Sequence, residues 1–170
     1  MMQSQTTPHV PFSDEIRARF AREVAKFPPA HAQSAVMACL SIIQDERGWV
    51  SRAAEDELAA YLGMAPIAVY EVTTFYNMYN QQPVGKFKIN VCTNLPCQLR
   101  DGQAALAHIC KKLDVAVGGT TADGQFTVQQ SECLGACADA PVMLVNDREM
   151  ISFMSTDRID DLLATLAQAK

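Results

Sequence analysis

The sequence predicts an α+β protein, with a small helical bundle in its N-terminal half and an α/β sandwich in its C-terminal half. Two observations lead to this prediction. Apolar residues recur at helical spacing from Phe12 to about Phe75, and strand-like alternation begins after residues 83–85. The length of 170 residues suits one domain or two small ones. We expect a loose tail at 1–11, a helical domain at 12–80 and an α/β domain at 81–170.

The first two helices are expected between Ser13 and Gly48. Ser13 can cap the first helix, and the two acidic residues after it favour the positive end of the helix dipole. Pro28 and Pro29 end this helix, because proline lacks a backbone donor and disfavours the α conformation in the residue before it. Pro29 can then start a second helix that stops at Gly48. Its apolar face is expected to contain Ala32, Val36, Cys39, Leu40 and Ile43.

Two further helices complete the N-terminal half. Ser51 can cap a helix that runs to Gly63, and Pro66 suits the first turn of a short fourth helix. The expected packing side chains of the fourth helix are Ile67, Val69, Tyr70 and Val72. The residues that follow are interpreted as a joint between domains or a partner interface, rather than a box that stacks a cofactor: Phe75, Tyr76, Met78 and Tyr79.

The C-terminal half alternates strands and helices. Residues 86–91 read KFKINV, which places Phe87, Ile89 and Val91 on one face of a strand. Further strands are expected at 126–130, 142–145 and 150–153, the last two joined as a hairpin by an Asn-Asp turn. Helices are expected at 102–113 and from Ser155 or Thr156 to Lys170. This order of elements predicts the α/β sandwich.

Composition excludes several classes of protein. An apolar content of 49% with 19% charged residues excludes wholesale disorder. The net charge of −5 argues against nucleic-acid binding, because contact with phosphates needs a basic face. The apolar runs at 35–43 and 58–70 are too short or too interrupted to cross a bilayer, which needs roughly 18 residues. We expect a soluble chain with neither a signal peptide nor a transit peptide.

Four of the six cysteines lie in two expected loops. Cys92 and Cys97 form C-x4-C directly after the first strand of the C-terminal half, and Cys133 and Cys137 form C-x3-C after a later strand. Without an export signal, these cysteines are expected to be reduced thiols with metal, cluster or catalytic roles. Strands that leave the same edge of a sheet deliver their following loops to one place. The two pairs can therefore meet there.

Four thiolates at one place suit a zinc ion or an iron–sulfur cluster. A [2Fe-2S] cluster needs two cysteines per iron, which two separated pairs provide, whereas zinc sites more often use C-x2-C pairs. The spacing favours the cluster and leaves a structural zinc site open. A thioredoxin-like dithiol enzyme is disfavoured, because the chain has no C-x-x-C. Glu132, directly before Cys133, is expected in an exposed loop, where its charge would tune the potential of a cluster.

The remaining cysteines and histidines are expected to have structural roles. Cys39 and Cys110 lie on apolar helix faces, where a free cysteine behaves as a small buried hydrophobe. A Rieske-type set of two histidines and two cysteines is disfavoured, because no histidine lies in either cysteine loop: His9, His31 and His108. We expect His108 on a solvated flank of its helix.

Whole strings in this sequence are more specific than the spacing of its cysteines. The strings CTNLPC at 92–97 and ECLGACADAPVMLVN at 132–146 resemble the family of E subunits of NADH-quinone oxidoreductase, respiratory complex I. Residues 48–50, 61–63 and 75–85 resemble the same family. The resemblance spans roughly residues 12–168, and it departs at none of the four cysteine positions.

The resemblance implies a thioredoxin-like [2Fe-2S] ferredoxin domain at 81–170, in which one cluster is ligated by Cys92, Cys97, Cys133 and Cys137. It implies exchange of single electrons with FMN, which takes a hydride from NADH on the neighbouring F subunit. The host would be the peripheral arm of a bacterial complex on the cytoplasmic side of the inner membrane, without direct membrane insertion. NAD-reducing hydrogenases and NAD-dependent formate dehydrogenases contain related subunits and stay open as hosts. This chain has no G-x-G-x-x-G after a strand and no P-loop, so FMN and NADH are expected on the partner.

Overall fold

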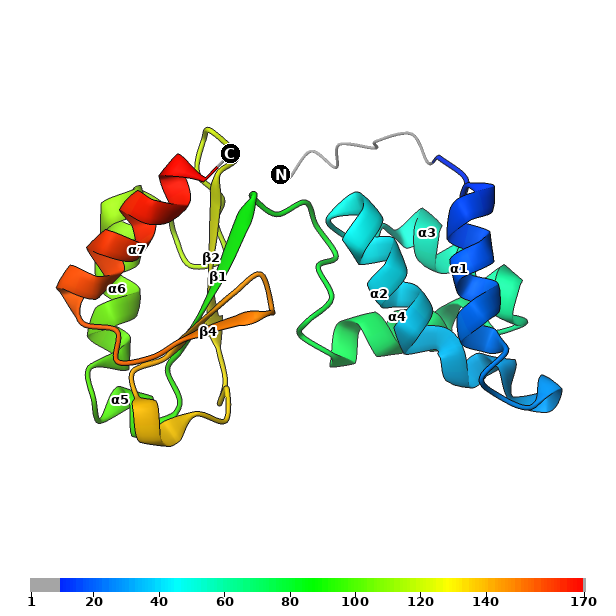
Figure 1. Ribbon diagram of the computed structural model, residues 1–170, viewed down its shortest axis with the longest axis horizontal. Helices are drawn as coiled ribbons and strands as arrows, with labels where there is room; N and C mark the ends of the chain where they lie inside the picture. The colour runs from blue at the N-terminus through cyan, green and yellow to red at the C-terminus, as the bar shows by residue number, and fades with distance from the viewer. Residues whose placement is uncertain (1–9, 170) are drawn as a thin grey trace. The chain divides into compact units, whose positions relative to one another are not determined.

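The computed structural model describes residues 10–169 of the chain (Figure 1). The described chain divides into two compact units, one that ends at Pro83 and one that begins at Val84. Most of the expected tail lies outside the described residues, and so do His9 and the expected helix end at Lys170.

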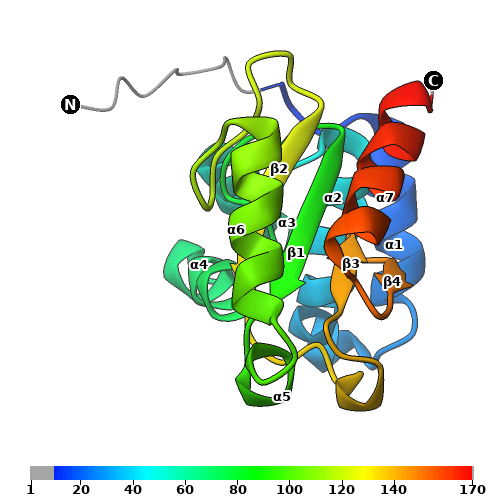
Figure 2. The same cartoon turned by 90° about the vertical axis from the view of Figure 1, so that its left-hand side faces the viewer.

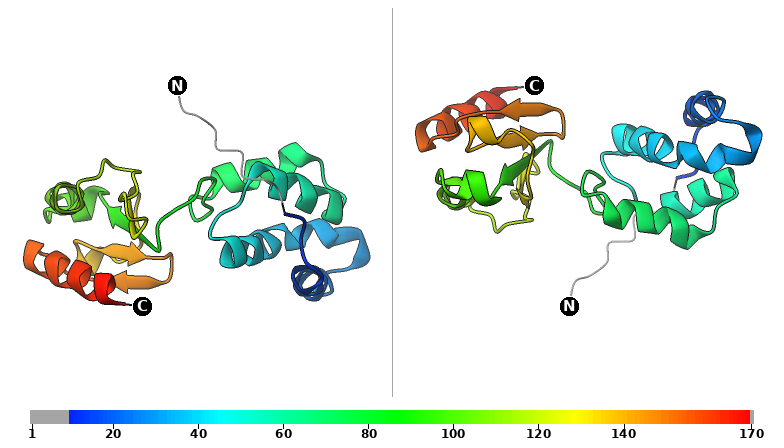
Figure 3. Two further views of the ribbon diagram at one scale, coloured as in Figure 1. Left: turned by 90° about the horizontal axis from the view of Figure 1, so that it is seen from above. Right: turned by 90° about the horizontal axis from the view of Figure 1, so that it is seen from below.

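The first unit is helical throughout its described residues (Figure 3). Its elements are α1 (Asp14–Val24), η1 (Pro29–Ala35), α2 (Val36–Arg47), α3 (Arg52–Leu62) and α4 (Pro66–Phe75). The predicted caps are confirmed. The hydroxyls of Ser13 and Ser51 accept hydrogen bonds from backbone N–H groups in the first turns of α1 and α3, at 3.3 and 3.2 Å. Gly48 and Gly63 end α2 and α3 in the left-handed conformation that favours glycine.

The second helix begins later than predicted. Residues 29–35 form the 3-10 helix η1, and His31 within it has non-helical dihedral angles, φ −123° and ψ 28°. The prediction of one continuous helix from Pro29 is therefore wrong, and the α-helix α2 starts only at Val36. The inward face of α2 is buried as expected, at Cys39, Leu40, Ile42 and Ile43.

Aromatic rings form the centre of the helical core. Phe20 is fully buried, and its ring centroid lies 5.1 Å from that of Phe12 and 5.3 Å from that of Tyr61. Tyr79 also belongs to this core, since it is 6% exposed and its hydroxyl donates to the carbonyl of Met37 at 3.0 Å. Grouping Tyr79 with an aromatic joint was therefore wrong.

The side chains of α4 are more exposed than predicted. Val69 is buried and Val72 half-buried, but Ile67 is 56% exposed and Tyr70 is 37% exposed. Neither of the exposed pair is a core residue, because the helix presents them to its outer side. The guanidinium of Arg52 lies over the ring of Tyr70, 4.3 Å from the ring centroid.

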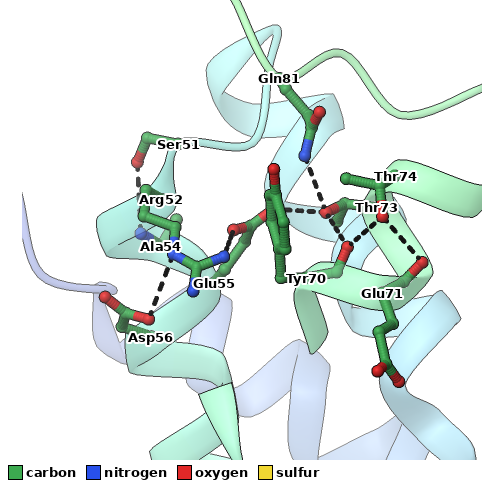
Figure 4. A network of polar contacts seen from close by, with 10 residues as sticks. All are labelled: Ser51, Arg52, Ala54, Glu55, Asp56, Tyr70, Glu71, Thr73, Thr74 and Gln81. Carbon is green, nitrogen blue, oxygen red and sulfur yellow. Dashed lines mark hydrogen bonds and ion pairs between the residues drawn. The ribbon is translucent and has the colours of Figure 1, made fainter. Parts of the chain in front are cut away.

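A charged side chain, Glu55, is buried within the helical unit (Figure 4). Its Oε1 accepts a hydrogen bond from the hydroxyl of Thr73, and its Oε2 accepts one from Arg52 at 3.2 Å. Gln81 donates to the same Thr73 hydroxyl at 3.1 Å. These contacts supply partners to a carboxylate that burial would otherwise penalise, and they join α3 to α4.

Thr73→Val should lower the free energy of unfolding of the helical unit by about 1–3 kcal/mol, because the buried carboxylate of Glu55 loses a donor. Thr74→Val is the matched control, since that exposed hydroxyl donates only to backbone carbonyls of its own helix. It should cost about 0.5 kcal/mol or less. Urea unfolding followed by the fluorescence of Trp49, the single tryptophan, measures both. Equal losses in the two variants would contradict the assigned role of Thr73.

The second unit contains a four-stranded sheet in the order β2-β1-β3-β4. The strands are β1 (Phe87–Cys92), β2 (Phe126–Ser131), β3 (Met143–Val145) and β4 (Glu149–Ile151). β1 pairs with β2 in parallel and with β3 antiparallel, and β3 with β4 form the predicted hairpin. The helices are α5 (Leu95–Gln98), α6 (Gly102–Leu113), η2 (Cys137–Asp139) and α7 (Thr156–Gln168). Figure 2 shows α6 and α7 on the same face of the sheet.

β1 is buried on both of its faces, which its alternating sequence did not predict. Ile89 and Val91 pack in the core beneath the helices, but Lys88 and Asn90 on the opposite face are also buried. Lys88 forms an ion pair with Asp147, and Asn90 donates to the same carboxylate at 2.7 Å. The turn of the β3–β4 hairpin therefore supplies the partner that allows polar side chains to be buried in β1.

Two residues of α6 differ in part from their predicted settings. His108 is not merely a solvated flank, because its Nε2 lies 2.8 Å from the carboxylate of Asp160 on α7. Lys112 and His108 hold the pKa of Asp160 below its usual range. Cys110 is half-buried and packs against the core of the unit, where burial raises its pKa. These contacts join α6 to α7.

Candidate metal centre

The sheet brings the two cysteine loops to one edge. β1 and β2 are parallel neighbours, and their last paired residues are Cys92 and Ser131. The loop with Cys97 therefore follows β1 at the same edge at which the loop with Cys133 and Cys137 follows β2. The expectation that parallel strand ends deliver both loops to one place agrees with this register.

One cysteine pair is buried. Cys92 is 2% exposed at the end of β1, and Cys97 is 1% exposed on the short helix α5. They pack with Ala140 and Val142. The sequence reasoning missed α5. Its signal is Asn94, whose side chain accepts the N–H of Leu95 at 3.0 Å and so caps the helix.

The other cysteine pair is exposed. The Sγ atoms of Cys133 and Cys137 lie 3.8 Å apart. The backbone N–H of Gly135 donates to Sγ of Cys133 at 3.4 Å, and Gly135 has a φ of +81° that a residue with a side chain rarely adopts. Small residues in this loop thus permit N–H contacts to sulfur, as the sequence suggested.

The ionisation of these thiols depends on one another. Burial raises the pKa of Cys97, the backbone N–H of Val142 lowers it, and Cys92 and Cys137 raise it further. The pKa of Cys137 is raised first by its hydrogen bond with Cys133, then by desolvation and by charge on Cys133 and Cys92. Effects that cross between the buried and exposed pairs place the sulfurs of both pairs near one another. Binding a metal here would displace protons, since thiolates are the ligands.

The donor set fits a binuclear cluster in kind and grouping. Four thiols stand as two pairs, which matches two cysteines for each iron of a [2Fe-2S] cluster. In residues 10–169, no three His, Cys, Asp or Glu side chains are already gathered closely enough to hold a single metal ion. Neither His31 nor His108 lies in the two loops. Cys39 is separate from the site, fully buried in the helical unit, where desolvation and then Glu23 raise its pKa to about 12.

The first residue of α6 fixes how closely that helix approaches the buried pair. Gly102 is buried, and a Cβ added to it would lie 2.8 Å from the carbonyl oxygen of Cys97 and 2.9 Å from that of Cys92. Both cysteine carbonyls therefore pack directly on the Cα of Gly102. The prediction of α6 from residue 102 is confirmed, but this contact carries no signal in the sequence pattern.

Comparison with known proteins supplies the family. A family model described as thioredoxin-like [2Fe-2S] ferredoxin matches residues 20–167. A mitochondrial NADH dehydrogenase [ubiquinone] flavoprotein 2 from Dictyostelium discoideum is 41% identical over 143 residues, which cover 82% of this chain and 58% of that protein. The E subunit of NADH-quinone oxidoreductase from Rickettsia conorii is 43% identical over 137 residues, which cover 79% of this chain and 81% of that protein.

Solved structures share the fold. The structure of an NAD+-reducing [NiFe]-hydrogenase in its H2-reduced state superposes with a TM-score of 0.66 at 24% sequence identity. The superposition covers 77% of this chain and 22% of the hydrogenase chain. No helix in the described part of the chain is long and apolar enough to span a membrane.

Proposed function

This chain belongs to the thioredoxin-like [2Fe-2S] ferredoxin family, and from that premise we propose that it is the electron-transfer component of an NADH-quinone oxidoreductase. One [2Fe-2S] cluster is held by Cys92, Cys97, Cys133 and Cys137. The observation that carries the proposal is the delivery of two cysteine pairs to one sheet edge by the parallel strands β1 and β2. Relatives that are named as components of the same oxidoreductase support it.

The chain's own residues prepare this site. When bound, the cluster supplies one-electron transfer. Cys92 and Cys97 hold their side of it in an apolar cluster that keeps water away. Backbone N–H groups of Val142 and Gly135 donate to sulfur, which stabilises negative charge on the ligands. The exposed pair, Cys133 with Cys137, lies on the side from which an electron partner can approach.

The electron partner in this proposal is the F subunit, which binds FMN and NADH in the peripheral arm of the complex. The complex lies on the cytoplasmic side of a bacterial inner membrane, and this chain is peripheral to the membrane. A related NAD-reducing hydrogenase or formate dehydrogenase is the alternative host, since the same exchange with FMN would serve there. Isolation of the native complex and identification of its other subunits separates these hosts.

Low-temperature electron paramagnetic resonance on anaerobically purified protein tests the proposed cluster. A silent oxidised sample that gains a rhombic signal after dithionite, at about one spin per chain, is the expected result for one [2Fe-2S] cluster. A colourless protein with about one zinc per chain would support the structural zinc site and overturn the electron-transfer function.

A further inference from the structure

Side-chain contacts continue to join the two cysteine loops past the ends of β1 and β2. The N–H of Thr93 donates to the carbonyl of Ser131 at 3.1 Å, and the side chain of Gln130 donates to the Thr93 hydroxyl at 2.7 Å. One residue further along each strand, Nδ2 of Asn94 donates to Oε2 of Glu132 at 2.9 Å. Asn94 and Glu132 are called the cross-loop pair below. These contacts extend the β1–β2 pairing into the ligand loops.

Asn94 acts on both loops with one side chain. Its Oδ1 caps α5, the helix that carries Cys97, and its Nδ2 reaches Glu132, the residue directly before Cys133. A shift of α5 relative to the second loop must therefore break either the cap or the hydrogen bond. The side chain lies between Cys92 and Cys97 in sequence, so it restrains the buried ligand pair against the exposed one.

Glu132 contributes a negative charge beside the second ligand loop. The side chain is exposed, and its carboxylate accepts the amide of Asn94. Reduction adds one negative charge to a cluster whose four thiolates already make it anionic. A nearby carboxylate disfavours that addition by Coulomb repulsion, and salt weakens the repulsion at an exposed site.

From these contacts we propose that the cross-loop pair is a positioning pair for the [2Fe-2S] cluster. Asn94 holds the two ligand loops at the separation that the cluster requires, and the charge of Glu132 lowers the reduction potential of the cluster. This inference rests on the proposed function, because it needs a cluster bound by the four cysteines.

The positioning role is tested by iron release from the full-length, cluster-loaded chain to a ferrous or ferric chelator. Asn94→Ser keeps a good helix cap but removes the amide that reaches Glu132. Its iron release should be about fivefold faster, which corresponds to the loss of one typical hydrogen bond. Glu132→Ala should behave alike, and the double variant should be no faster than either single variant, since both remove the same contact. Wild-type release from Asn94→Ser and Glu132→Ala would overturn the positioning role.

The electrostatic role is tested by redox titration of Glu132→Gln. This variant keeps an oxygen that can accept the Asn94 amide, so its iron release should match that of the wild type. Its reduction equilibrium should favour the reduced form by several-fold at low ionic strength, where a tenfold change equals 59 mV, and the difference should shrink as salt is added. An unchanged potential at low salt would overturn the electrostatic role.

Glu149→Gln is the control for charge. Glu149 is exposed and pairs with Val145, which in turn pairs with Ile89, away from the end of β1 that carries Cys92. It removes the same charge and should leave the potential unchanged; a shift equal to that of Glu132→Gln would assign the effect to net charge alone and overturn the local role. A wild-type chain without a [2Fe-2S] signal would overturn the proposed function itself. A loaded wild type with unaffected variants would overturn only the cross-loop pair.

Discussion

Alanine at any one of Cys92, Cys97, Cys133 or Cys137 is expected to remove most of the bound iron and the reduced-state resonance signal. A [2Fe-2S] cluster with three thiolates leaves one iron with an incomplete ligand set. Iron and sulfide analysis of the anaerobically purified variants, together with their resonance spectra, measures the loss. The four variants should lose the cluster together, because the proposal assigns each thiol to the same group.

The two positions of each pair differ in what else they disturb. Cys92 and Cys97 are almost fully buried, so alanine there also leaves a small cavity, at a cost of order 1–2 kcal/mol. Cys133 and Cys137 are exposed and should cost little stability beyond the cluster. Cluster loss without loss of folding at Cys133 therefore separates a ligand from a merely structural cysteine.

The remaining cysteines are the matched controls. Cys39→Ala removes a fully buried thiol in the helical unit, and Cys110→Ala removes a half-buried one on α6. Both should retain full iron content and lose only packing energy, about 1–2 kcal/mol or less. A colourless Cys110→Ala protein, or a fully loaded Cys133→Ala protein, would contradict the ligand assignment.

Local chemistry made most of the helix and strand boundaries predictable. Ser13 and Ser51 are caps because their hydroxyls satisfy N–H groups that a first turn leaves unpaired, and this requirement can be recognised from sequence alone. The convergence of the cysteine loops was also predictable, because it needs only two strands that run in the same direction. Short range and fixed geometry are what these features share.

Features that depend on distant partners were not predictable. Lys88 is buried because Asp147, far along the chain, forms its ion pair, and no pattern around Lys88 contains that information. Tyr79 belongs to the helical core because its hydroxyl finds the carbonyl of Met37. The tie from Asn94 to Glu132 likewise joins two loops whose approach is decided by the sheet. Periodicity reports which face is apolar, but it does not report which polar group a fold will bring near.

Gly102→Ala is expected to damage the cluster site through the backbone alone. The added Cβ would lie 2.8 Å from the Cys97 carbonyl oxygen and 2.9 Å from that of Cys92, and real Cβ contacts essentially never come this close. Either α6 or the two cysteine segments must shift. Such overpacking costs typically about 1–3 kcal/mol, which the better helix propensity of alanine offsets by about 1 kcal/mol. Iron release to a chelator should be markedly faster, because both carbonyls belong to cluster ligands.

Gly85→Ala distinguishes damage at the site from general loss of stability. A Cβ at Gly85 would meet the backbone of Phe126 at 2.9 Å, a clash of the same severity just before β1 begins, whereas Cys92 ends that strand. Thermal unfolding should show a lowered midpoint for this variant too, by about 4–8 °C for each kcal/mol lost from a unit of this size. Its iron release should stay close to the wild-type rate when measured well below the midpoint. If Gly85→Ala released iron as fast as Gly102→Ala at equal stability, the crowding at the cysteine carbonyls would not be the cause. Because the two clashes match in kind and differ in place, a difference in iron release isolates the contact between α6 and the buried cysteine pair.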